Sequence, residues 1–169
     1  LEDANGRYIS TSVLPSSAHA LYQAGATLYF HLRPNPYLQA WKSSLASQLG
    51  VTGVQLSLFV GKKGTGTRLH FDANDNFTVQ LLGEKTWSLH RNDSVREPTQ
   101  NWVPSTEVPG ELRYYCPEDL EREVPRTARR VTLAPGSVLY VPRGHWHGTV
   151  SRSDAISLNI CLPPVSWAR

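Results

Sequence analysis

Two histidines and one aspartate have the types and the spacing needed to hold a divalent metal ion. His70 and Asp72 lie two residues apart, so their side chains share one face of an extended chain and can reach one ion together. His147 comes much later, as the last residue of Val-Pro-Arg-Gly-His-Trp-His. Two imidazoles and one carboxylate leave positions open on Fe(II), where an oxo acid and O2 can bind. We therefore predict a metal site formed by His70, Asp72 and His147.

A further histidine, His145, competes with His147 for the third position. The two residues also lie two apart, so they share a face if this segment is extended, and spacing alone does not separate them. The remaining histidines have no partner at a useful spacing, and we interpret them as ordinary residues: His19, His31 and His90.

Polar residues close to His70 suggest a pocket around the predicted metal. Asn76, Thr78 and Gln80 alternate with apolar residues, so one face of this predicted strand is polar and the other is apolar. A row of polar side chains that faces the interior of a β-fold indicates a ligand-binding site. Lys85 follows His70 by fifteen residues and opens the next predicted strand. If the Lys85 side chain points inward, it needs an anionic partner, because a buried unpaired ammonium is very costly.

The elements that must position these residues are mainly strands. Two early segments, 14–25 and 37–50, have the start and stop residues and the apolar spacing of helices. After Gly50 the pattern has a period of two, which predicts strands at 54–60, 76–82, 85–90, 130–133, 137–141, 148–151 and 155–162. Helices followed by short strands favour a double-stranded β-helix, the cupin-like jelly roll, with an N-terminal helical flank. The segment Leu69-His70-Phe71-Asp72 is also expected to be a strand.

The long segment 92–128 has five prolines and little periodicity, except for one predicted helical turn at 118–122. Loops of this length in compact domains are often lids or binding loops. Its mixture of aromatic and charged residues suits recognition of an extended polypeptide, although the aromatics could instead pack the loop onto the barrel. The residues concerned are Trp102, Tyr114, Tyr115, Arg113, Arg122, Glu111 and Glu121. Trp41, Trp87 and Trp102 are interpreted as core or loop anchors.

The composition is that of an ordinary globular domain, with 40% hydrophobic and 18% charged residues among 169. We expect one domain over 1–169, with a helical flank at 1–50 and a β-core at 51–165. The net charge of +3 indicates a solvated basic surface rather than a nucleic-acid-binding face. Cys116 and Cys161 lie far apart, which argues against a zinc cluster and fits a reducing cytoplasm. No apolar run reaches the length of a membrane span. The chain has no methionine, not even an initiating one, so we expect a fragment of a longer protein, from which terminal targeting signals could be missing.

Two stretches of the sequence resemble the JmjC-type, cupin-like oxygenases that use Fe(II) and 2-oxoglutarate. The first is 67–87, whose Gln-Leu-Leu-Gly-Glu-Lys-Thr-Trp portion is similar to the ribosomal-oxygenase branch. Its Thr67 and Asn76 resemble the asparaginyl hydroxylase that acts on hypoxia-inducible factor. The second stretch, 133–159, resembles the closing strands of the same family. The resemblance covers about residues 51–165, without the long loop.

The resemblance implies roles for individual residues. In the family pattern the last ligand follows an aromatic residue, as His147 follows Trp146, which favours His147 over His145. His70, Asp72 and His147 would hold Fe(II). Lys85 and Thr67 would bind the distal carboxylate of 2-oxoglutarate, and Asn76 and Asn159 would approach the co-substrate or the bound oxygen. The sequence departs from the ribosomal-oxygenase branch, which usually lacks an asparagine at the position of Asn76 and carries further dimerisation and winged-helix regions.

The implied activity is hydroxylation of a peptide or protein side chain, with 2-oxoglutarate and O2 as co-substrates. A small molecule or a modified nucleotide is the alternative substrate. A metal cupin that does not use 2-oxoglutarate is the alternative enzyme, and in that case Lys85 would be structural. A degenerate cupin acting as a binding module is the non-enzyme reading, which the presence of His70, Asp72 and His147 disfavours. We expect no membrane partner, and a homodimer is compatible with the sequence.

Overall fold

The fold was established from a computed structural model, which describes residues 12–33, 35–104, 106–115, 120 and 123–164. In these residues no helix has the length and the apolar character required to cross a membrane. The elements in chain order are α1 (Pro15–Gln23), β1 (Leu28–His31), α2 (Pro36–Leu49), β2 (Gln55–Gly61), β3 (Asp75–Leu82), β4 (Lys85–His90), α3 (Gly110–Tyr115), β5 (Arg129–Leu133), β6 (Val138–Val141), β7 (Trp146–Ser151) and β8 (Ala155–Leu162).

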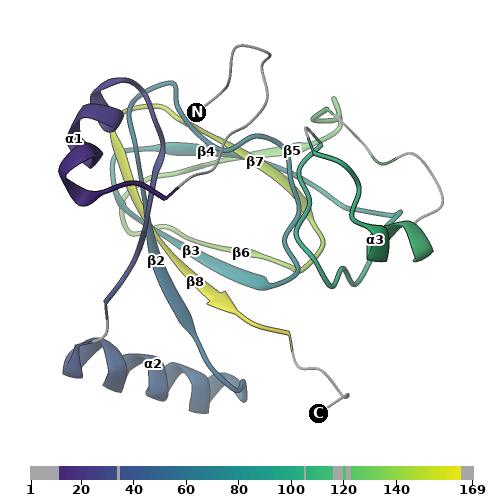
Figure 1. Cartoon of the computed structure of the whole chain (residues 1–169), viewed down its shortest axis with the longest axis horizontal. Coiled ribbons are helices and arrows are strands. Elements are labelled where there is room, and N and C mark those ends of the chain that lie inside the picture. Colours follow the sequence, from purple (N-terminus) through teal and green to yellow (C-terminus); the bar gives the residue numbers. More distant parts are fainter. Residues whose placement is uncertain (1–11, 34, 105, 116–119, 121–122, 165–169) are drawn as a thin grey trace.

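Two antiparallel sheets face each other (Figure 1). The larger sheet has the strand order β1-β2-β8-β3-β6, and the smaller sheet has the order β5-β4-β7. Strands distant in sequence are neighbours in the sheet: β8 pairs with every residue of β2. This arrangement confirms the predicted mainly β, cupin-like jelly roll with a helical flank.

Helix α2 covers the outer face of the larger sheet. It begins where the Asn35 side chain accepts a hydrogen bond from the backbone N–H of Leu38 at 2.9 Å, and it ends at Gly50, whose φ is 66°. Its apolar side chains Leu38, Leu45 and Ala46 pack against an apolar cluster of the sheet. The members of this cluster lie on or next to β2, β3 and β8: Val54, Leu56, Phe77, Val79, Leu158, Ile160 and Leu162. The helix therefore covers the apolar face of β3, and the polar face of that strand points into the space between the sheets.

The inward face of β3 is polar, as predicted. Asn76, Thr78 and Gln80 are all buried. Gln80 satisfies its own amide: it donates to the carbonyl of Leu82 at 2.7 Å and accepts from the Ser157 hydroxyl at 2.9 Å. Gln80 is thus a structural residue, while Asn76 and Thr78 line a pocket between the sheets.

Residues 69–72 do not form the strand that the sequence predicted. His70 makes an isolated bridge with His147, whereas the next residue, Phe71, makes one with Trp102 on the other side. The chain changes neighbour after a single residue, so no continuous ladder can form. The alternation of side chains persists nevertheless: Leu69 and Phe71 are buried in an apolar cluster, and His70 and Asp72 point into the pocket.

The long loop is anchored to the barrel by Trp102. This residue is 1% exposed and packs with Phe71 and Trp146. The interpretation of Trp102 as a residue that packs the loop onto the barrel is therefore confirmed, and the hypothesis that Trp102 recognises a polypeptide is wrong. Tyr114 is 92% exposed, on the short helix α3, which the sequence pattern did not reveal. The predicted turn at 118–122, including Glu121 and Arg122, lies outside the described residues, as do Cys116 and the side chain of Tyr115.

Strand β1 lies within the segment predicted as a helical flank. Its four residues, Leu28–His31, pair with β2 in the register Leu28 to Val60 and His31 to Ser57. Leu-Tyr-Phe-His has no alternation of polar and apolar residues, so the period-two pattern could not reveal it. The strand forms one edge of the larger sheet, and three of its four residues are exposed.

Close contact between the 64–67 segment and β7 makes Gly66 sensitive to substitution. A Cβ atom at Gly66 would lie 1.9 Å from the carbonyl oxygen of Thr149. We expect Gly66→Ala to lower the free energy of unfolding by at least about 1–3 kcal/mol, the usual cost of overpacking. Gly53→Ala is the control, because a Cβ there meets nothing within 4 Å. Equal denaturant midpoints for the two variants would contradict this close approach.

Candidate metal centre

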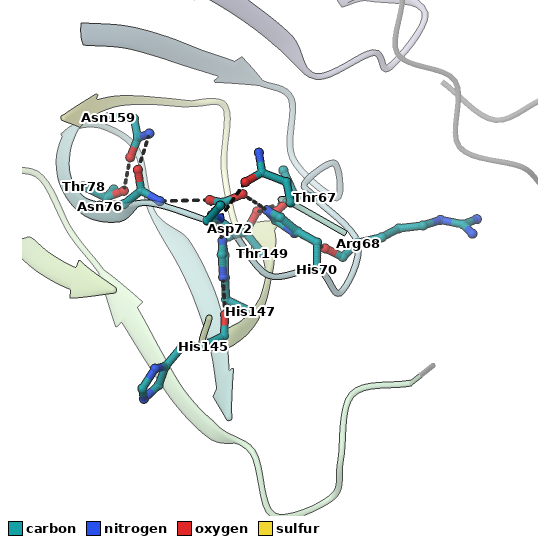
Figure 2. Close-up of polar contacts among 12 residues, drawn as sticks. Thr67, Arg68, His70, Asp72, Asn76, Thr78, His145, His147, Thr149 and Asn159 are labelled. Atoms are coloured by element: carbon teal, nitrogen blue, oxygen red, sulfur yellow. Dashed lines mark hydrogen bonds and ion pairs between the residues drawn. The ribbon is translucent and has the colours of Figure 1, made fainter. Parts of the chain in front are cut away.

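Three side chains that could share one metal ion meet between the sheets. One ligand atom from each of His70, Asp72 and His147 lies within 4.8 Å of the other two. Asp72 Oδ1 is 3.9 Å from His70 Nε2, and Asp72 Oδ2 is 3.6 Å from His147 Nε2 (Figure 2). The structure thus brings together all three residues of the predicted triad.

The backbone holds the two imidazoles opposite each other. His70 donates its N–H to the carbonyl of His147 at 2.9 Å, and His147 donates in return to the carbonyl of His70 at 2.8 Å. The ring centroids are 4.1 Å apart. Such a pair of reciprocal bonds fixes residues directly across an antiparallel bridge, so both rings start from defined positions.

Hydrogen bonds also select the tautomer of each ring. His70 Nδ1 lies 2.7 Å from the carbonyl oxygen of Arg68, and His147 Nδ1 lies 2.9 Å from the carbonyl oxygen of His145. A carbonyl oxygen can only accept, so each Nδ1 carries the proton and each Nε2 lone pair remains for a metal. Burial, reinforced by the neighbouring His70, holds the pKa of His147 well below its ordinary value, which keeps the ring in the neutral, ligating form.

His145 supports the centre through its backbone rather than through its ring. The carbonyl of His145 accepts the bond from His147 Nδ1, while its imidazole is directed away from the other two histidines and Asp72 (Figure 2). His145 precedes β7, whereas His147 lies on that strand. Strand β7 begins two residues earlier than the sequence predicted, and this extension carries His147 into the smaller sheet.

A chain of hydrogen bonds runs from Asp72 into the larger sheet. Asn76 Nδ2 donates to Asp72 Oδ2 at 2.9 Å, Asn159 Nδ2 donates to Asn76 Oδ1 at 3.2 Å, and Thr78 Oγ1 donates to Asn159 Oδ1 at 3.3 Å. Burial raises the pKa of Asp72, while the electrostatic effect of the nearby His70 and the bond from Asn76 lower it. Asn76 therefore favours the carboxylate form and fixes its orientation. The role of Thr78 was not foreseen, although it belongs to the predicted polar stripe.

Lys85 brings a buried positive charge to the same pocket. It is 4% exposed, and among the described residues its ammonium has no hydrogen bond or ion pair; the Phe59 ring lies 5.9 Å from Nζ. Burial lowers the pKa of Lys85 to about 8. A buried ammonium without a counter-ion is unfavourable, so this position suits the carboxylate of a bound ligand.

Two threonines and a tryptophan complete the wall between Lys85 and the histidines. Thr67 and Thr149 share a hydroxyl–hydroxyl bond of 3.0 Å, and both line the pocket. Trp87 stacks on His147 with ring centroids 5.7 Å apart, and its Nε1 is buried without a partner among the described residues. Sequence reasoning found Thr67 but assigned no site role to Thr149 or Trp87. Both follow from β-alternation once β7 and β4 are paired, since Trp87 lies opposite Thr149.

Cupin-like proteins are built in this way, with two facing antiparallel sheets that enclose a small group of ligating side chains. The donor set fits a divalent metal with open positions, because it offers two imidazole Nε2 atoms and a carboxylate from one side. The fold and the pocket therefore define a cupin-like domain with a candidate metal centre.

The particular family follows from comparison with known proteins. The family model described as JmjC domain matches residues 28–169, so the chain belongs to the JmjC domain family. This confirms the resemblance to JmjC-type, cupin-like oxygenases. Fe(II), 2-oxoglutarate and O2 are the cofactor and co-substrates of this family.

Similar proteins come from bacteria and animals. Protein YxbC of Bacillus subtilis is 33% identical over 174 residues, covering 99% of this chain and 53% of YxbC. Human ribosomal oxygenase 1 is 31% identical over 156 residues, covering 88% of this chain and 22% of the oxygenase. A solved structure of the Escherichia coli ribosomal oxygenase YcfD with cobalt and 2-oxoglutarate aligns at 20% identity and a TM-score of 0.46, covering 67% of this chain and 24% of that one. The chain spans about half or less of the length of these curated relatives.

Proposed function

We propose that this domain is an Fe(II)- and 2-oxoglutarate-dependent oxygenase that hydroxylates a peptide or protein side chain. One observation carries the proposal: the buried ammonium of Lys85, which has no ion-pair or hydrogen-bond partner in the described part of the chain, lines the same pocket as the ligand atoms of His70, Asp72 and His147. A metal cupin that does not use 2-oxoglutarate has no need of such a cation. The protein substrate is supported by the names of similar proteins, among them ribosomal oxygenase 1 and the Drosophila persimilis NO66 lysine demethylase and histidyl-hydroxylase.

In this proposal, different side chains bind the metal and the co-substrate. His70, Asp72 and His147 hold the metal through two Nε2 atoms and one carboxylate. When bound, Fe(II) with 2-oxoglutarate and O2 supplies the oxidation that inserts one oxygen atom into a substrate C–H bond, with 2-oxoglutarate converted to succinate and CO2. The ammonium of Lys85 and the hydroxyl of Thr67 bind the distal carboxylate of 2-oxoglutarate, so the co-substrate spans the pocket in one orientation.

The asparagines act behind the metal ligands in this proposal. Asn76 donates to Asp72 and receives a bond from Asn159, so both orient the carboxylate that meets the metal. Trp87 stacks on His147 and keeps that ring from rotating. The walls of the pocket exclude bulk water from the reacting atoms, which protects the oxidation from side reactions.

Turnover of 2-oxoglutarate tests the proposal directly. The iron-loaded protein should convert 2-oxoglutarate to succinate, and the rate should rise when the protein substrate is added. Hydroxylation of that substrate should appear in mass spectra as the gain of one oxygen atom. A protein that binds iron and O2 but neither binds nor consumes 2-oxoglutarate would be a metal cupin of another class, and hydroxylation confined to small molecules or nucleotides would replace the protein substrate.

Removal of the Asn76 amide is expected to weaken metal binding. Asn76→Ala takes away the bond that favours the ionised form of Asp72, so the pKa of Asp72 should rise further and metal binding should require a higher pH. Residues that orient metal ligands typically contribute about 10–100-fold to metal affinity. Titration with Co(II) measures the loss. Ser157→Ala is the control, since Ser157 lines the pocket but bonds to Gln80; equal loss in both variants would refute the orienting role.

A further inference from the structure

A second, cationic pocket lies at the end of β1. It has a volume of about 140 Å³ and is lined by His31, Arg33, Lys42 and Gln55, with leucines beneath them. None of the described residues that line it is acidic. Arg33 and Lys42 form no ion pair or hydrogen bond with any other described residue. The pocket therefore offers two uncompensated positive charges to an anion.

The surroundings of this pocket reinforce its charge. The sequence has no Asp or Glu between Asp3 and Asp72, so the strand, the helix and the turn that form the pocket contribute only basic groups. The acidic residues are concentrated from Asp72 onward. A surface with one sign of charge raises the local concentration of ligands of the opposite sign.

Sheet register connects this pocket to the candidate metal centre. His31 pairs with Ser57, and Ser57 pairs with Asn159. Residues paired across strands point to the same face, and Asn159 faces the metal-binding pocket, so His31 faces the same side of the sheet. Two strand spacings separate His31 from Asn159, which is about 10 Å. The cationic pocket thus lies at the β1 edge, between the two faces of the sheet: His31 is on the metal-centre face, whereas Lys42 belongs to α2 and Leu56 packs under α2 on the opposite face.

Strand β1 is also open to a partner. It pairs with β2 on one side and, within the described ranges of the chain, forms the edge of the sheet on the other. Tyr29 pairs with Phe59 and so lies on the metal-centre face; it is 48% exposed and packs edge-on against the His31 ring, with ring centroids 4.7 Å apart. An exposed edge with an aromatic side chain is a surface along which an extended polypeptide binds. A nucleic acid strand would instead require a row of Lys or Arg side chains to follow its phosphates, and here Arg33 and Lys42 stand alone.

We propose that the His31, Arg33 and Lys42 pocket binds an acidic side chain of an extended polypeptide substrate, which reaches from there to the metal centre. This proposal rests on the proposed function and specifies its substrate class. The shortest path, from His31 to Asn159, is about 10 Å, so an extended chain needs at least about three residues to reach from one site to the other. The substrate therefore carries Asp or Glu at that distance from the residue that is hydroxylated.

Direct binding tests the pocket without catalysis. The probes are a fluorescent peptide of alternating threonine and glutamate and the matching peptide of threonine and glutamine. The metal-loaded protein should bind the glutamate peptide about five- to thirtyfold more tightly at low salt, as expected for two exposed ion pairs. Arg33→Ala/Lys42→Ala should abolish this preference. The control Lys63→Ala/Arg130→Ala removes the same charge elsewhere and should retain it.

The outcomes separate the two proposals. If Arg33→Ala/Lys42→Ala loses the preference but binds Co(II) and 2-oxoglutarate as the parent protein does, the acidic-substrate pocket stands, whether or not turnover is found. If 2-oxoglutarate is consumed while the glutamate and glutamine peptides bind equally, this inference fails and the proposed function remains. An equal loss in the control variant, or tighter binding of oligothymidylate than of the glutamate peptide, would also overturn it.

Discussion

Replacement of Lys85 by alanine is expected to weaken 2-oxoglutarate binding by about 100- to 5,000-fold. Loss of one partner from a buried ion pair typically costs about 3–5 kcal/mol, and about 1.4 kcal/mol corresponds to a tenfold change in affinity. Lys85 is 4% exposed, so solvent does not screen the interaction. Calorimetric titration of the Co(II)-loaded protein with 2-oxoglutarate gives the affinity. Co(II) binding itself should not change, because Lys85 is not among the candidate ligands.

The same lysine should make 2-oxoglutarate binding depend on pH. Burial lowers the pKa of Lys85 to about 8 in the protein without ligand, and only the ammonium form attracts a carboxylate. Affinity should therefore be constant below about pH 8 and fall about tenfold per pH unit above it, since one proton must then be taken up on binding. The Lys85→Ala protein should lack this dependence. Equal affinities in the two proteins, or the same pH profile, would mean that Lys85 does not bind the co-substrate.

Substitution of His147 is the second change with a large expected effect. His147→Ala removes one of three candidate ligands, so the loss of Co(II) affinity should exceed the about 10–100-fold typical of residues that only orient ligands. His70→Ala should behave in the same way, because its Nε2 is presented by an equivalent backbone bond. Metal analysis after dialysis and direct titration both measure the effect.

His145→Ala is the matched control for that experiment. It lies two residues from His147, but its ring is directed away from the centre, and the carbonyl that supports His147 remains in the variant. Metal affinity should therefore stay close to that of the parent protein. Loss of metal in His145→Ala together with retention in His147→Ala would assign the third ligand to His145.

The strands near the site were predictable from sequence because each has one apolar and one polar face. β3 is the clearest case: Phe77 and Val79 pack under α2, while Asn76 and Thr78 face the pocket. α2 was predictable within one residue at each end, since Pro36 begins it and Gly50 ends it in a left-handed conformation. Strand alternation and helix ends depend on residues that are close in sequence, so the sequence alone reveals them.

The features that sequence missed depend on contacts between distant segments. The 69–72 segment has the pattern of a strand, but His70 and Phe71 bond to different neighbours. Trp102 has the composition of a recognition residue, and only the packing against Phe71 and Trp146 shows it to be core. The bond from Asn76 to Asp72 spans only four residues, but it depends on the bend between residue 72 and β3, which spacing does not show. Spacing placed these residues near a site but could not say which atom each one touches.

The reciprocal bonds between His70 and His147 have a consequence for folding. The two residues are 77 positions apart, so the metal centre is absent until most of the β-core has assembled. Contacts of such long sequence separation make folding slow, because a long stretch of chain must be ordered before they form. A metal held by this candidate centre would bind the native state and have no comparable site in the unfolded chain, so an ion at 100 times its dissociation constant would stabilise the fold by about 2.7 kcal/mol. A cell short of iron would therefore hold a larger unfolded fraction of this protein.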